Sequence, residues 1–203
     1  MKLFFVRHGE SEANILHEFS NRGFKHGLTE RGFQQAKQLG RKLRGVPFTK
    51  IYTSPLKRAF QTAEILKKHQ DCPLEISDAL REFDTGILEG KSDPGSWEIH
   101  TKVFNQWVDG NWEARIPGGE SHLDIQARFI PFIENLTRKP KNTNVLMVGH
   151  GGLFGSMLPL IITNLEFASI GEIQIHNAMP IIAETRPDGL YCTQWGDVEL
   201  FEV

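Results

Sequence analysis

Cysteine is scarce in this chain of 203 residues, and its two cysteines, Cys72 and Cys192, lie far apart in the sequence. They cannot form the CxxC pair of a cysteine zinc site, and two cysteines do not make a disulfide framework. We therefore interpret both as reduced thiols and expect a cytoplasmic protein. The histidines outside the motifs described below, His100 among them, show no metal-ligand spacing, so the sequence indicates no metal and no cofactor.

Long apolar runs and an excess of one charge are also missing. The apolar start, Leu3 to Val6, ends at Arg7 and is too short for the core of a signal peptide. No later run approaches the ~20 residues that a membrane span needs. The chain has 23 Lys and Arg against 25 Asp and Glu, and no block of like charge. We expect neither a membrane nor a nucleic-acid partner, and an anionic ligand would need a local cluster of basic groups.

The composition is that of a globular protein, with 39% hydrophobic and 24% charged residues. Its length predicts a single domain over residues 1–203. Short apolar runs predict buried strands at Leu3–Val6, Ile51–Thr53 and Val145–Val148, with a minor strand at Leu74–Ile76.

Helices are predicted between these strands. Capping residues indicate where they begin: at Thr29, at Ser54 with Pro55 in the first helical position, at Ser121, and near Leu153. Gly45 is expected to end the first of these helices, and Pro159 to kink or end the last. Strands alternating with helices predict a three-layer α/β/α fold with a mostly parallel central sheet.

Two segments depart from this alternation. Residues 89–119 are rich in Gly, Pro, Asp and Trp, and predict an irregular insertion with one or two helices that covers a face of the core. Its tryptophans are expected to serve packing rather than base stacking. Residues 173–203 alternate short apolar runs with turns, which predicts edge strands or a hairpin around Pro187–Gly189.

Polar residues follow three of the predicted strands, at the edge where ligands bind in α/β sheets. His8, Ser54 and His150 each come directly after a strand. Arg7 adjoins His8, and Arg58 lies in the first turn of a predicted helix, where free N–H groups favour an anion. Because a guanidinium group matches phosphate oxygens, the pattern predicts a pocket for a phosphate-sized dianion. Taken alone, His150 could equally be a core histidine.

Six segments, in this order and spacing, resemble the histidine phosphatase superfamily, whose members include cofactor-dependent phosphoglycerate mutases and many small phosphatases. They are Arg7-His8-Gly9-Glu10-Ser11 with Asn14, Leu28–Gly32, Ser54–Ala63, Leu80–Gly90, Pro117–Ser121 and Val148–Gly152. Together they extend over about three quarters of the chain. The resemblance implies a phosphoglycerate mutase-like fold in which residues 89–119 cover the active site.

The resemblance also implies catalytic and binding roles for individual residues of these segments. His8 would be the nucleophile that forms a phosphohistidine, with its other ring nitrogen donating to a backbone carbonyl. Arg7, Arg58 and His150 would bind the phosphoryl oxygens and offset the charge of the transition state, so that no metal is needed. Asn14 would add a neutral donor.

Glu82 is implied as the proton donor to the leaving alkoxide and then as the base that activates water. Burial near Leu80 and Phe83 could raise its pKa, as this role requires. Glu10, Asp84 and Glu89 are nearby acidic residues that stay open as alternatives. Gly151 is expected to let the backbone approach the substrate closely.

One segment departs from the family's pattern. Many members carry a Gln-Gly pair and then an aspartate between the positions of Asn14 and Leu28. Here Asn21 could replace the glutamine as a substrate-binding residue, and Lys25 or His26 takes the place of the aspartate. This predicts a cationic rim and a preference for substrates with a second anionic group.

The same histidine chemistry supports more than one activity. A mutase of this family usually has a longer chain and extra arginines after the acid segment, whereas Lys91 and Lys102 are the only cations between Glu89 and Arg115. We therefore predict a phosphatase of the histidine acid type acting on a small phosphomonoester. A phosphoglycerate mutase and a non-catalytic phosphate-binding module remain the alternatives. The sequence leaves the oligomeric state open, a homodimer included.

Overall fold

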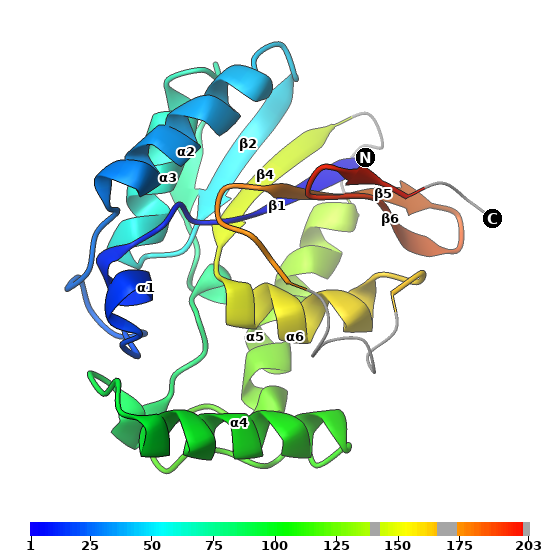
Figure 1. The fold of residues 1–203 in the computed structure, drawn as a ribbon. Helices are drawn as coiled ribbons and strands as arrows, with labels where there is room; N and C mark the ends of the chain where they lie inside the picture. Colours follow the sequence, from blue (N-terminus) through cyan, green and yellow to red (C-terminus); the bar gives the residue numbers. More distant parts are fainter. Residues whose placement is uncertain (139–142, 166–173, 201–203) are drawn as a thin grey trace.

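The computed structural model describes residues 1–138, 143–165 and 174–200, and within them a single sheet of seven strands forms the centre (Figure 1). Its order is β3-β2-β4-β1-β5-β6-β7. The first four neighbours run parallel: β3 (Leu74–Ile76), β2 (Phe48–Thr53), β4 (Asn144–Gly149) and β1 (Lys2–Arg7). The others pair antiparallel: β5 (Pro180–Arg186), β6 (Gly189–Trp195) and β7 (Val198–Glu199).

Helices cover both faces of the sheet, because the strands carry apolar side chains on both sides. Leu3 and Phe5 of β1 belong to one apolar cluster, and Phe4 and Val6 to another. The first cluster is completed by α5 (His122–Thr137) and α6 (Gly151–Ile161), and the second by α2 (Glu30–Lys42) and α3 (Lys57–Lys67), as Figure 1 shows. The predicted three-layer α/β/α fold is therefore confirmed, with the parallel strands β3, β2, β4 and β1 forming one side of the central sheet.

Two of the predicted capping residues, Thr29 and Ser121, cap helices in the structure, whereas Ser54 does not. Thr29 Oγ1 accepts a hydrogen bond from the Gly32 N–H, and Ser121 Oγ accepts one from the Asp124 N–H. The start expected at Ser54 is wrong: α3 begins at Lys57, since Ser54 Oγ accepts from the N–H of Leu56 and closes a turn before the helix.

The helix ends also depart from the sequence-based expectation. The helix that Thr29 caps ends at Lys42, three residues before Gly45, whose φ of 90° belongs to the following turn. Pro159 lies inside α6, which continues to Ile161, so the proline falls in its last turn.

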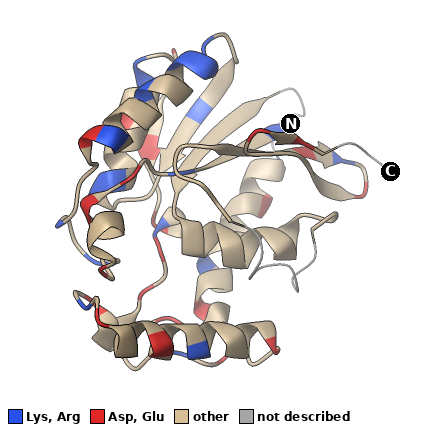
Figure 2. Ribbon diagram, viewed as in Figure 1, with Lys and Arg blue, Asp and Glu red and all other residues tan. Residues whose placement is uncertain are grey.

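The segment 89–119 contains one regular helix, α4 (Pro94–Val108), which Asp93 caps and which lies apart from the sheet (Figure 1). The described part of the chain also contains three short helices: α1 (Glu12–Leu16), η1 (Asp78–Leu80) and η2 (Gly86–Leu88). Figure 2 shows basic and acidic residues dispersed over the ribbon, with both signs on α4.

The carboxyl-terminal segment forms the expected hairpin, with β5 and β6 joined at Pro187 and Asp188. However, β5 is not an edge strand, because it pairs with β1 on its other side. Ile173 and Val203, the ends of the predicted segment, lie outside the described residues. None of the helices in the described ranges is long and apolar enough to cross a membrane.

Candidate active site

His8 follows β1 at the carboxyl edge of the parallel strands, and its ring is fixed at both nitrogens. Nδ1 lies 2.7 Å from the carbonyl oxygen of Gly9, to which it donates, and Nε2 accepts from Arg58 Nε at 3.0 Å. Burial, reinforced by the charges of Arg58 and Arg7, holds the pKa of His8 well below its usual value. The imidazole is therefore neutral at pH 7, with its lone pair on Nε2.

Glycines explain how the His8 loop is held. A Cβ on Gly32 would lie 2.0 Å from the carbonyl oxygen of Glu10, and one on Gly9 would lie 2.5 Å from the carbonyl oxygen of Gly32. The start of α2 therefore packs backbone against backbone on the loop. Glu10 Oε1 accepts from Thr29 Oγ1, so its side chain supports this helix start.

Two guanidinium groups lie beside the His8 ring. Arg58, the second residue of α3, donates through Nη1 to the carbonyl oxygen of Ser20 at 2.7 Å. Burial lowers the pKa of Arg58 to about 10, which leaves it charged at neutral pH. Arg7 donates through Nη1 to the carbonyl oxygen of Ile175, whereas its Nε is buried and has no hydrogen-bond partner in the described part of the chain.

His150 follows β4 and lies against His8, with 5.1 Å between the ring centroids. Its Nε2 is 2.8 Å from Ser54 Oγ, which accepts from the N–H of Leu56. When the Ser54 hydroxyl donates to Nε2 in this contact, the histidine's own proton lies on Nδ1. Nδ1 is buried without a partner among the described residues, so a ring nitrogen with unused hydrogen-bonding capacity lies beside the His8 ring.

Glu82 reaches the same edge from the loop between η1 and η2. Its carboxylate accepts from the N–H groups of Gly152 at 2.9 Å and Leu153 at 2.7 Å, at the start of α6. Burial raises the pKa of Glu82, and these hydrogen bonds and Arg58 oppose the rise only in part. The carboxyl group therefore keeps its proton to a higher pH than an exposed glutamate.

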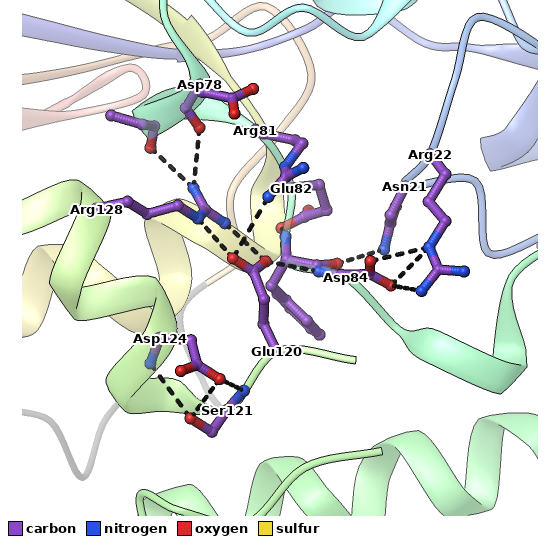
Figure 3. Close-up of polar contacts among 12 residues, drawn as sticks. Asn21, Arg22, Asp78, Arg81, Glu82, Asp84, Glu120, Ser121, Asp124 and Arg128 are labelled. Atoms are coloured by element: carbon purple, nitrogen blue, oxygen red, sulfur yellow. Dashed lines mark hydrogen bonds and ion pairs between the residues drawn. The ribbon is translucent and has the colours of Figure 1, made fainter. Parts of the chain in front are cut away.

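An ionic cluster fixes the Glu82 loop (Figure 3). Glu120 accepts from the backbone N–H of Asp84 at 2.8 Å and from Arg128 Nε at 2.8 Å. Arg128 also donates to the carbonyl oxygen of Ala79, before the loop. On the other side, Arg22 binds both carboxylate oxygens of Asp84. Asp84 is thereby engaged in an ion pair.

The structure brings most of the predicted site residues to one cavity of about 640 Å³. Those that line it are Arg7, His8, Asn14, Asn21, Arg58, Glu82 and Gly151. His150 lies fully buried beside His8. Gly151 is pressed against Arg7, since a Cβ there would lie 3.2 Å from Arg7 Nε.

The two asparagines differ in what they offer to the cavity. Asn14 Oδ1 accepts from the N–H and the hydroxyl of Ser11, which turns its NH₂ group toward other acceptors. The side-chain NH₂ of Asn21 donates to the carbonyl oxygen of Phe83 at 2.9 Å. Glu89, one of the alternative acids, accepts from the backbone N–H of Asn21. Asn21 is therefore bound to the loop that carries Glu82.

Aromatic side chains that the sequence analysis left without a site role also line the cavity: Phe19, Phe83, Trp97, His100 and Phe104. Burial lowers the pKa of His100 to about 4, so this ring is neutral at pH 7. Trp97, His100 and Phe104 are spaced i, i+3 and i+7, which places them on one face of a helix. This spacing was the sequence feature that could have indicated an aromatic side of the cavity.

The described residues do not form the expected cationic rim. Lys25 forms an ion pair with Glu18, and Glu18 rather than Lys25 lines the cavity. His26 Nε2 also lies 3.0 Å from Glu18 Oε1. The described residues hold no group of three or more His, Cys, Asp and Glu side chains arranged for a metal ion.

The fold and the site define an α/β protein with a buried, neutral histidine beside two arginines, in a cavity of about 640 Å³ at the sheet edge. The sequence model of the histidine phosphatase superfamily (branch 1) matches residues 3–198, and the chain belongs to this superfamily. This confirms the resemblance drawn from the six segments.

Individual relatives agree with this assignment. The chain is 32% identical over 162 residues to "Probable phosphoglycerate mutase GpmB" of Salmonella choleraesuis (strain SC-B67), which covers 80% of this chain and 75% of that relative. The solved structure of Bacillus stearothermophilus YhfR is similar with a TM-score of 0.83, 25% identity and 98% coverage of both chains. The alpha-ribazole phosphatase from Shigella flexneri has the same fold, with a TM-score of 0.80, 24% identity, and coverage of 100% of this chain and 99% of that chain.

Proposed function

We propose that this chain is a metal-independent phosphomonoester hydrolase that forms a phosphohistidine on His8 Nε2. The observation that carries the proposal is the fixed tautomer of His8: Nδ1 donates to Gly9, and the Nε2 lone pair faces the guanidinium of Arg58. A neutral imidazole beside two cations is suited to attack a phosphate dianion, since the cations offset the charge that a nucleophile alone would repel.

In the first step, a phosphoryl oxygen takes the Arg58 Nε–H that His8 Nε2 accepts in the free protein. This frees the lone pair to attack phosphorus. Arg7 Nε and His150 Nδ1 are both buried without a hydrogen-bond partner in the described chain and would bind the other oxygens, the His150 proton then lying on Nδ1. As the bond from phosphorus to the ester oxygen breaks, the leaving oxygen takes the proton of Glu82.

In the second step, the Glu82 carboxylate takes a proton from a water molecule, whose oxygen attacks the phosphohistidine. The bond between phosphorus and His8 Nε2 breaks, and the lone pair returns to the imidazole. Inorganic phosphate leaves, and Glu82 is again protonated. Each group ends the cycle as it began, so a small phosphorylated metabolite and water are the only reactants.

The test is release of inorganic phosphate from a panel of phosphomonoesters, with rapid-quench detection of an acid-labile phosphoenzyme. Release that survives a chelator and is lost in His8→Ala supports the proposal. His69→Ala is the matched control, because His69 packs near Gly40 of α2 and does not line the cavity. Retained phosphate release in His8→Ala would refute the phosphohistidine route.

A phosphoglycerate mutase is the second candidate, favoured by the name of the Salmonella relative. A mutase must return the phosphoryl group to a reoriented substrate before water reaches it. Isomerisation of phosphoglycerate without phosphate release would support this candidate. A protein that binds phosphate but forms no phosphoenzyme with any substrate would instead be a binding module.

A further inference from the structure

The cations of the cavity are concentrated at the His8 end. Arg7 and Arg58 are the only Lys or Arg among its described lining residues. Lys25, the nearest expected addition, is held by Glu18. Once Arg7 and Arg58 hold the phosphate, a second negative charge on a bound ester would meet no further Lys or Arg among the described lining residues.

Five of the other residues that line the cavity are aromatic, and their rings form a connected set. Phe19 lies 4.2 Å from Trp97 between ring centroids. His100 is stacked with Phe83 at 5.6 Å and with Phe104 at 6.4 Å, with interplanar angles of 18° and 13°. Trp97 is fixed by its Nε1–H, which donates to the carbonyl oxygen of His17 at 2.9 Å. Such preorganised faces bind planar rings better than saturated ones of equal size.

Glu18 is the charged group of this aromatic part. Its Oε1 accepts from Lys25 and His26, and hydrogen bonds from these side chains lower the pKa of Glu18, so the carboxylate is ionised at neutral pH. Both bonds fall on one oxygen. Oε2 has no hydrogen bond from the described chain and is available to accept from a ligand.

We infer that the substrate is a phosphomonoester whose alcohol part carries a planar aromatic ring, with no second negative charge and with a hydrogen-bond donor toward Glu18. The inference rests on the proposed hydrolase function and names its substrate class. Phe19, Phe83, Trp97, His100 and Phe104 stack on or beside the ring, and Glu18 repels a carboxylate on it while accepting from an amide or hydroxyl.

The experiment compares kcat/KM for phosphate esters with similar leaving groups: benzyl and cyclohexylmethyl phosphate, and the meta and para isomers of carboxybenzyl and of carbamoylbenzyl phosphate. We expect benzyl phosphate to exceed cyclohexylmethyl phosphate by about tenfold, the size of an aromatic stacking contribution. Carbamoylbenzyl phosphate should exceed its carboxybenzyl counterpart by at least about tenfold in one isomer pair.

Two variants, each with a matched control, test whether Glu18 and Trp97 cause these substrate preferences. Glu18→Gln should reduce the carbamoyl-to-carboxy ratio, whereas Glu12→Gln should leave it unchanged, because Glu12 also faces His26 but does not line the cavity. Trp97→Ala should reduce the benzyl-to-cyclohexylmethyl ratio. Phe24→Ala, which removes an exposed ring outside the cavity, should not.

The outcomes separate the two proposals. Phosphate release at equal rates from all esters, or fastest from the carboxybenzyl ester, overturns the substrate class while the hydrolase stands. Ratios that do not respond to Glu18→Gln or Trp97→Ala overturn the assignment to this part of the cavity. No phosphate and no phosphoenzyme from any ester overturns the hydrolase itself, and with it the inference.

Discussion

Burial lowers the pKa of His8 and raises the pKa of Glu82, and both shifts favour the reaction proposed here. Loss of water disfavours the charged form of either group, so the pKa of the base falls and that of the acid rises. Both shifts widen the pH range in which His8 is neutral while Glu82 keeps its proton. Arg58 strengthens the first effect and weakens the second, because its charge repels an imidazolium and attracts a carboxylate.

This pair predicts the pH profile of hydrolysis. As pH rises through the raised pKa of Glu82, the acid loses its proton and kcat/KM falls. As pH falls, His8 becomes protonated only well below its ordinary value of 6.5, so the acidic limb is displaced downward. Glu82→Gln should remove the limb at higher pH and lower kcat for alkyl phosphates by about 10²–10⁴-fold.

Steady-state rates against pH check this, with a second substrate and a control variant. 4-Nitrophenyl phosphate should lose less activity in Glu82→Gln, since its leaving group needs no proton. Glu98→Gln, on the outer side of α4 away from the cavity, should keep the wild-type profile. If Glu82→Gln keeps the same profile as well, Glu82 is not the proton donor.

At the scale of elements, the sequence predicted what depends on neighbours along the chain. Thr29 and Ser121 mark helix starts because their oxygens bind N–H groups three residues later. The site histidine His8 was predictable because it ends a buried strand. Ser54 misled the prediction, because its hydroxyl is shared between Leu56 and His150, and the second partner is 96 residues away.

The aromatic part of the cavity could not be predicted in the same way. Trp97 and His100 recur at helical spacing, but their sequence does not say which face of α4 turns toward His8. That orientation depends on contacts such as Trp97 Nε1 with the His17 carbonyl, between segments 80 residues apart. Glu18 was missed for the same reason, since its ion pair with Lys25 reverses the charge expected at the rim.

The element that carries Glu82 depends on an ion pair that is largely buried. The side chains of Glu120 and Arg128 are 15% and 16% exposed, and Arg128 joins the loop to α5. Glu120→Ala leaves the guanidinium and the Asp84 N–H without their acceptor. We expect a loss of about 2–4 kcal/mol in the free energy of unfolding, measured by urea denaturation.

Glu134 provides the control for this loss. It pairs with Arg138 at 3.7 Å on the surface of α5, and both side chains are more than half exposed. Glu134→Ala should change the free energy of unfolding by less than about 0.5 kcal/mol. Equal effects of the two substitutions would show that the Glu120 cluster does not stabilise the loop.

For the whole molecule, the order of the strands decides which residues meet. β2, β4 and β1 are adjacent and parallel, so the residues that follow them, Ser54, His150 and His8, come to one edge although they are distant in sequence. The same arrangement buries two guanidinium groups near each other, and each lowers the pKa of the imidazole between them. A fold that concentrates positive charge in this way is stabilised by any dianion that occupies the pocket.

Inorganic phosphate should therefore raise the melting temperature of the whole protein. Phosphate at 100 times its Kd adds about 2.7 kcal/mol, which corresponds to roughly 5–10 °C for a chain of this size. Arg7→Met should lose most of this increase, because it removes the unpartnered Nε donor as well as a positive charge. Arg31→Met is the matched control, since Arg31 is 73% exposed and pairs with Glu10 outside the pocket. Calorimetry in phosphate and in sodium chloride of equal ionic strength separates binding from screening. The same increase in both salts, or in both variants, would mean that the pocket does not bind phosphate.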